Sequence, residues 1–210
     1  RRRDFRLLYI GQFVSFFGSM MSYVAMPYIL YQATKSTLLT GLLGVIQLVP
    51  SVVGGLFGGA LADAVDRRRL IVFCELGMAG IVLAMGVACA VLKPGYPGPW
   101  WILLASAGLS IFNGFHRPAL EALTPRLVPR EELPAVGVLS SLRGNVGMIG
   151  GPAVAGILIS TGGADWAFFF DFATFVICVA AVLALRNVPS HERRSAFSVS
   201  AVHEGFKYAM

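Results

Sequence analysis

Six long stretches of almost uninterrupted apolar residues constrain what this chain can fold into. They comprise residues 7–31, 39–62, 70–92, 100–123, 134–160 and 166–186. A helix needs about 20 apolar residues to cross a bilayer core of about 30 Å, and each stretch is long enough. Backbone groups in hydrocarbon must find hydrogen-bond partners within their own segment, which a helix provides. The sequence therefore predicts an all-α integral membrane protein whose six transmembrane helices form one bundle over residues 1–188.

The composition does not fit an ordinary water-soluble domain. Only 13% of the 210 residues are charged, whereas about 25% are charged in a typical soluble domain. The net charge of +6 comes from basic residues in short connectors between apolar stretches, so no nucleic-acid partner is expected. The three cysteines lie inside apolar stretches without a C-x-x-C spacing, which predicts no disulfide framework, no metal site and no cofactor.

The connectors between the apolar stretches alternate in charge. Arginines precede the first stretch and follow the second, fourth and sixth, namely Arg1, Arg2, Arg3, Arg6, Arg67, Arg68, Arg69, Arg126, Arg130, Arg193 and Arg194. The intervening connectors contain Lys35, then Lys93, then no basic residue. Because basic loops stay on the cytoplasmic side, both ends of the chain are predicted to be cytoplasmic. Residues 189–210 are polar with an amphipathic stretch, and they are predicted to lie along the membrane or in a cytoplasmic loop.

The connector after the second stretch has the sharpest local pattern. It contains Gly59, Leu61, Asp63, Asp66, Arg67 and Arg68. A carboxylate at the membrane edge is followed within one short turn by three guanidinium groups, so Asp63 is placed to cap a helix or to pair with a basic group on a neighbouring helix. A simple turn that holds positive charge on one side of the membrane is the other interpretation.

A second pattern lies in the fifth stretch, which contains Gly147, Gly151, Pro152 and Gly156. Proline removes a backbone hydrogen bond and bends a helix, while small residues let another helix approach closely. Taken alone, the glycines would favour an ordinary packing face.

The connector pattern resembles the signature loop between helices two and three of the major facilitator superfamily, with Ala64 and Asp66 departing from its usual residues. The fifth stretch resembles the antiporter motif of export-type members, with Ala155 in place of one glycine. The resemblance covers the whole chain, and Phe170-Asp171-Phe172 is similar to the enterobactin-exporter or macrolide-efflux branch of drug and siderophore exporters. It implies the amino-terminal six-helix half of a twelve-helix protein of a bacterial inner membrane.

Polar residues within the first stretch form one helical stripe. Gln12, Ser15, Ser19 and Ser22 follow one another at steps of three, four and three residues. The stripe either lines a central cavity or joins helices by hydrogen bonds, since serines do both.

Further polar groups in the spans are candidates for substrate or proton binding, because a charge in the bilayer needs a partner or an aqueous cavity. They are Asn113, Arg117, Glu121, Arg143 and Asp171. Arg117 and Glu121 are four residues apart and can pair along one helix, although Arg117 can also reach the membrane surface. Arg143 is an alternative partner for Glu121. Asp171 is expected to hold a proton or to be hydrogen-bonded to a hydroxyl or a helix end.

Two other ionisable residues have simpler expectations. Glu75 is expected to pair with Arg67–Arg69 or to reach the lipid headgroups, and His116 is a lone histidine. No catalytic set is visible in the sequence, so the chain is not expected to be an enzyme.

The resemblance implies a secondary transporter that exports a small organic compound in exchange for protons, with the carboxy-terminal half and membrane lipid as partners. Asp63, Arg67 and Arg68 would then form a latch to the other half, and the fifth span would bend at Pro152 between the halves. The alternative is a non-transporting receptor or assembly subunit on the same scaffold.

Overall fold

A computed structural model describes residues 2–93 and 95–186, without the side chains of residues 2, 56, 59, 60 and 62–64. Within these ranges the fold is all-α. The long helices are α1 (Arg2–Thr34), α2 (Thr37–Ala64), α3 (Arg67–Val91), α4 (Pro99–Leu123), α5 (Leu133–Thr161) and α6 (Ala164–Leu183). Two short 3₁₀ helices, η1 (Thr124–Leu127) and η2 (Arg130–Glu132), connect α4 to α5. The amphipathic stretch predicted within residues 189–210 lies outside the described residues.

Four of the long helices, α2 to α5, begin where a side chain or a proline satisfies the first turn, not where the apolar stretch begins. The Ser36 hydroxyl accepts a hydrogen bond from the Leu39 amide and caps α2. Asp66 caps α3 in the same way through the amides of Arg68 and Arg69. Prolines stand in the first turn of α4 and of α5, where their missing N–H is not needed.

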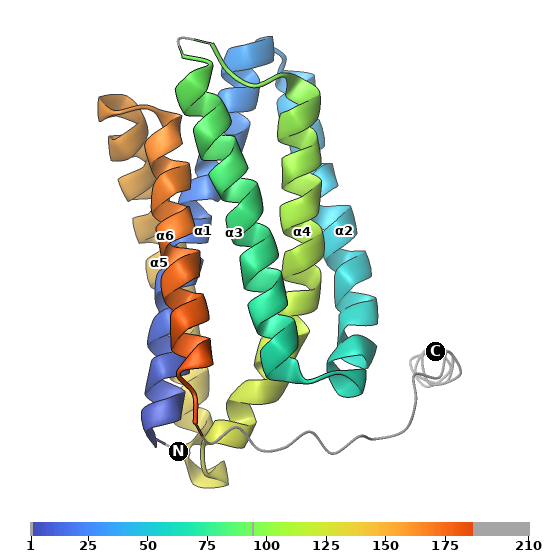
Figure 1. Ribbon diagram of the computed structural model, residues 1–210, viewed down its shortest axis with the longest axis vertical. Helices are drawn as coiled ribbons and strands as arrows, with labels where there is room; N and C mark the ends of the chain where they lie inside the picture. Colours follow the sequence, from blue (N-terminus) through green and yellow to red (C-terminus); the bar gives the residue numbers. More distant parts are fainter. Residues whose placement is uncertain (1, 94, 187–210) are drawn as a thin grey trace.

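The six long helices form an up-and-down bundle in which successive helices run in opposite directions (Figure 1). The core lies between α1, α3, α4 and α6, while α2 packs mainly on α4 and α5 mainly on α1. Figure 1 shows α2 and α5 on opposite flanks of the bundle. In the most apolar windows of α2 and α5 only 11% and 17% of residues are buried, against 50% in α3. The two flanking helices therefore have little cover from the rest of the described chain.

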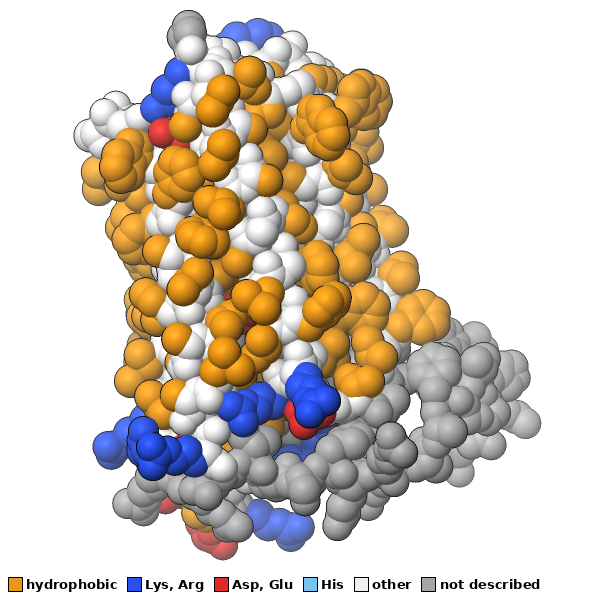
Figure 2. Space-filling model, in the orientation of Figure 1, with side chains coloured by type: hydrophobic (Ala, Val, Ile, Leu, Met, Phe, Trp, Pro, Cys, Tyr) orange, Lys and Arg blue, Asp and Glu red, His pale blue; other side chains and the backbone are white. Residues whose placement is uncertain are grey.

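The surface of the bundle has the pattern of a membrane protein. On the face that Figure 2 shows, hydrophobic side chains cover the length of the bundle, whereas lysines and arginines gather towards its ends. We call the end with the amino terminus and the α2–α3 and α4–α5 connectors the basic end. Among the described residues five helices are long and apolar enough to cross a membrane, namely α1, α2, α3, α5 and α6. α4 is not among them, since Asn113, His116 and Arg117 lower its mean hydropathy.

The opposite end of the bundle is held by an ion pair. Lys93 Nζ lies 2.8 Å from Asp165 Oδ1, and it also donates to the Gly162 carbonyl at 3.1 Å. Gly163, the residue before α6, has a φ of 108°, which is unfavourable for a residue with a side chain. It lies beside this ion pair. These contacts join the connector after α3 to the turn between α5 and α6.

Candidate functional site

A polar pocket of about 270 Å³ lies inside the bundle. Serines from α1 and α4 line it together with Asp171 from α6. Asp171 is only 1% exposed. It accepts hydrogen bonds from Ser22 Oγ at 2.5 Å and from Thr174 Oγ1 at 3.3 Å. This carboxyl is therefore held in place by two hydroxyls at the edge of a space that a small molecule or water can enter.

A glycine lets α1 and α6 approach each other beside this carboxyl. A Cβ on Gly18 would lie 2.8 Å from Asp171 Oδ1 and would also overlap Thr174 Oγ1. A side chain at this position would therefore push Asp171 away from α1.

Other polar groups around the pocket come from several helices. Gln47 and Ser51 belong to α2, and Asn113 and Arg117 belong to α4. Ser106 Oγ, also in the lining, is buried and has no hydrogen-bond partner among the described residues. A buried hydroxyl without a partner is costly, so it is available to a ligand or water in this pocket. The arrangement is suited to a compound with several hydrogen-bonding groups.

Closer to the basic end, a second buried cluster surrounds Glu75. Glu75 is 0% exposed, and its Oε1 lies 3.0 Å from His116 Nε2. Gln12 Nε2 and Ser15 Oγ donate to the two carboxylate oxygens, each at 3.1 Å, and Cys178 Sγ donates to Oε1 at 3.3 Å. The expectation that Glu75 pairs with Arg67–Arg69 or reaches the headgroups is therefore wrong, because two helical turns carry it into the bundle. His116, a lone histidine, has this carboxylate as its partner.

The polar stripe of α1 is divided between these two sites. Gln12 and Ser15 contact Glu75, whereas Ser19 and Ser22 line the pocket that contains Asp171. The stripe therefore joins helices at one end, through Gln12 and Ser15, and lines the pocket at the other, through Ser19 and Ser22.

The remaining polar candidates lie closer to the surface. Arg117 Nε donates to Glu121 Oε1 at 3.1 Å, and both side chains are mostly exposed. Arg143 lies over the ring of Phe16, with 5.8 Å between its Cζ and the ring centroid. The structure therefore pairs Glu121 with Arg117 and gives Arg143 an aromatic neighbour on α1.

The connector between α2 and α3 joins three helices at the basic end. Arg68 donates from Nε to the Val182 carbonyl at 3.1 Å and from Nη2 to the Leu183 carbonyl at 2.6 Å. Arg67 Nη1 donates to the Ala122 carbonyl at 3.4 Å. A guanidinium is favourable at a helix carboxy terminus, where carbonyls are left over. The surroundings of Gly59 and the side chain of Asp63 lie outside what the structure describes; Leu61 is half-buried on the last turns of α2.

The glycines of the α5 motif face two directions. A Cβ on Gly147 would lie 2.5 Å from the Phe16 ring, and one on Gly151 would lie 3.1 Å from the Phe17 carbonyl oxygen. Both glycines therefore allow close packing of α5 on α1. A Cβ on Gly156, beyond Pro152, would meet no atom within 4 Å.

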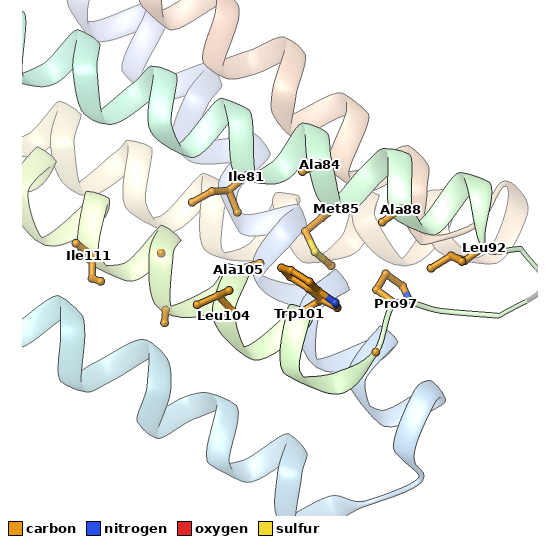
Figure 3. A pocket seen from close by; sticks show the side chains of 13 residues that line it. Ile81, Ala84, Met85, Ala88, Leu92, Pro97, Trp101, Leu104, Ala105 and Ile111 are labelled. Carbon is orange, nitrogen blue, oxygen red and sulfur yellow. The ribbon is translucent and has the colours of Figure 1, made fainter.

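A larger hollow of about 800 Å³ lies on the outer face between α3 and α4 (Figure 3). Its lining is apolar, with Ile81 and Met85 from α3 and Trp101 and Leu104 from α4 pointing into it. Trp101 and Leu104 are 68% and 63% exposed, so the hollow opens to the surroundings of the bundle. It has no ionisable group and is not the candidate site.

Comparison with known proteins places these sites in context. The model of a family described as transmembrane secretion effectors matches residues 1–210. The enterobactin exporter EntS of Shigella boydii serotype 4 (strain Sb227) is 28% identical over 211 residues, which cover 98% of this chain and 49% of that protein. The protein of the same name from Escherichia coli O1:K1 / APEC has the same identity and coverage. The chain spans about half the length of the curated relatives it matches.

Proposed function

The chain belongs to the transmembrane secretion effector family of the major facilitator superfamily, and from this premise we propose that it forms the amino-terminal half of a twelve-helix secondary transporter that exports a small organic compound in exchange for protons. Its exporter relatives make it part of a transporter, not an enzyme. The observation that carries the proposal is Asp171, a buried carboxyl on a polar pocket inside a membrane bundle.

The proposed carboxy-terminal half would cover α2 and α5. These helices are the least buried of the five that are long and apolar enough to cross a membrane, and they flank the bundle on opposite sides. Several of their glycines have no atom within 4 Å of a Cβ position, namely Gly41, Gly44, Gly55, Gly137, Gly144 and Gly156. Small residues allow close approach of helices in a membrane. The pocket would then lie between the two halves and open alternately to either side as they rock.

The substrate class follows from the relatives and from the pocket. The relatives are named enterobactin exporters, and a siderophore or a drug-like compound with many hydrogen-bonding groups suits the serines, amides and Arg117 of the lining. Exporter relatives do not favour the alternative of a non-transporting receptor or assembly subunit.

Transport itself tests this proposal. The full-length protein in proteoliposomes with an acidic interior should accumulate a siderophore or a cationic or neutral drug, and a protonophore should stop the accumulation. If no candidate compound moves in response to the pH gradient, although the protein is folded and correctly inserted, the proposed function is wrong.

The orientation is also part of the proposal. All six long helices cross the bilayer, α4 included, and the basic end faces the cytoplasm. A cysteine at Arg69, which is exposed, should react with a membrane-impermeant maleimide only from the cytoplasmic side. Labelling from the periplasm would reverse the orientation.

The α2–α3 connector would act as the latch between the halves. Asp63 lies in the last turn of α2, four residues before Arg67 in the sequence, and Arg67 and Arg68 donate to carbonyls at the ends of α4 and α6. Asp63→Asn is expected to reduce export to background while the protein still inserts and purifies as one species, because the carboxylate would lose its charge-assisted contact with the other half. Export at the wild-type rate by this variant would exclude the latch.

A further inference from the structure

The buried cluster around Glu75 brings four helices to one carboxylate. Gln12 and Ser15 come from α1, His116 from α4 and Cys178 from α6, while Glu75 itself belongs to α3. An ionised carboxylate only accepts hydrogen bonds, and here it faces a donor on each of the three other helices. A buried charge of this kind is tolerated only when it is paired and hydrogen-bonded.

The contacts of His116 Nε2 depend on where one proton lies. This nitrogen lies 3.0 Å from Glu75 Oε1 and 3.3 Å from Gln12 Nε2. It must carry a hydrogen to donate to an ionised Glu75, and it must lack one to accept from the amide of Gln12. With the proton on Nε2, the imidazole donates to Glu75 and cannot accept from Gln12; with the proton on Glu75, Nε2 accepts from the carboxyl and is also open to the Gln12 amide. The position of this proton therefore decides whether α4 can be hydrogen-bonded to α1, while its contact with α3 is kept in both arrangements.

The cluster lies between two hollows that differ in size. A hollow of about 20 Å³, enough for one water, is lined by Tyr9, Gln12, Thr124 and Arg143 on the side of the basic end. The pocket with Asp171 lies on the other side. Along α1, Tyr9 lines the small hollow, Gln12 and Ser15 belong to the cluster, and Ser19 lines the pocket.

The other helices have the same order. On α4, Leu120 lines the small hollow, His116 belongs to the cluster and Ser110 lines the pocket. On α6, Cys178 belongs to the cluster and Asp171 to the pocket. The sequence of sites from basic end to pocket is therefore a property of the bundle and not of one helix.

We propose that Glu75 and His116 share one transported proton and form a relay between Asp171 and the basic end of the bundle. With one shared proton the pair is neutral overall. Loss of that proton, or the gain of a second proton, would leave an uncompensated buried charge. The relay rests on the proposed function, since it gives the protons of that exchange a second site. Each transfer breaks one O–H or N–H bond and makes another, so no co-reactant is needed.

The groups around the pair define what else can titrate with it. Cys74 on α3, Cys178 and Asp171 on α6 and Arg143 on α5 lie close enough for electrostatic interaction with the cluster. From α1, Gln12 and Ser15 contact Glu75 and do not titrate, whereas Tyr9 lines the adjoining small hollow. His116 is thus the basic group in hydrogen-bond contact with Glu75.

Glu75→Gln and His116→Gln, each in the full-length protein, test the relay in proteoliposomes. Each variant should lose the part of export that depends on the pH gradient but keep substrate exchange in the absence of a gradient. Glu131→Gln removes an exposed carboxylate at the basic end and should keep both activities. Gradient-driven export at the wild-type rate by folded Glu75→Gln would overturn the proposal.

A second measurement needs neither a variant nor transport. In wild-type protein labelled with ¹⁵N-histidine and ¹³C-glutamate, the Nε2 signal of His116 and the carboxyl signal of Glu75 should change with pH at one common midpoint, because a shared proton affects both. Separate midpoints, or a change in only one signal, would overturn the relay. Since this titration needs no substrate, it still decides about the pair if the protein exports nothing.

Discussion

Asp171→Asn is expected to abolish export driven by a pH gradient while the bundle stays folded. Asparagine has nearly the shape of aspartate, and its amide oxygen can still accept from Ser22 or Thr174, so packing between α1 and α6 is kept. It cannot bind and release a proton, which removes the chemistry proposed for the pocket. The measurement is uptake of substrate into proteoliposomes with an acidic interior, compared with liposomes that contain no protein.

A second carboxylate on the same helix provides the matched control. Asp165 lies in the first turn of α6 at the opposite end from the basic end, where Lys93 Nζ is 2.8 Å away. Asp165→Asn removes the same charge from α6 outside the pocket, and its gradient-driven uptake should stay close to wild type. Equal loss in both variants would mean that α6 needs its charges for folding, and unchanged uptake by Asp171→Asn would exclude Asp171 as a proton site.

The helices could be predicted from the sequence almost to their ends. The stretch 70–92 corresponds to α3 (Arg67–Val91), and 134–160 corresponds to α5 (Leu133–Thr161). Differences are confined to the termini, because hydropathy reports the part of a helix inside the bilayer, whereas caps decide where it starts. α1 begins at Arg2, five residues before its apolar stretch, since polar residues continue the same hydrogen-bond ladder.

The sites were less predictable, since their partners come from distant parts of the chain. The stripe of α1 indicated polar contacts, but nothing in one helix shows that Gln12 meets Glu75 and His116, which lie 63 and 104 residues further along. Glu75 follows the arginines Arg67–Arg69 so closely that the sequence predicts a surface pair. The available signal was the lack of any other charge between residues 70 and 92, because a single carboxylate deep in a span requires an internal partner.

The helix that packs against the α5 motif was also difficult to predict from the sequence. Its glycines predicted a close helix contact, and the structure provides one with α1 through Gly147 and Gly151. The motif did not identify the partner helix, nor did it single out the closer contact between α2 and α4. There the backbones meet at Gly54 and Gly114, a pair from separate stretches with no motif of its own.

Gly54→Leu and Gly114→Leu are expected to destabilise the full-length protein strongly. A Cβ on Gly114 would lie 2.8 Å from Gly54 Cα, and one on Gly54 would lie 2.9 Å from Gly114 Cα, so only a shift of a whole helix can make room. Overpacking costs about 1–3 kcal/mol when side chains can adjust, and a backbone contact should reach or exceed that upper value. Unfolding in detergent measures the loss in the free energy of unfolding.

Gly80→Leu on α3, where a Cβ would meet no atom within 4 Å, should unfold like wild type. A similar loss at all three positions would mean that added apolar bulk, not the α2–α4 contact, is responsible. A loss confined to Gly54 and Gly114 would show that the close contact between the α2 and α4 backbones holds these two helices together in the bundle.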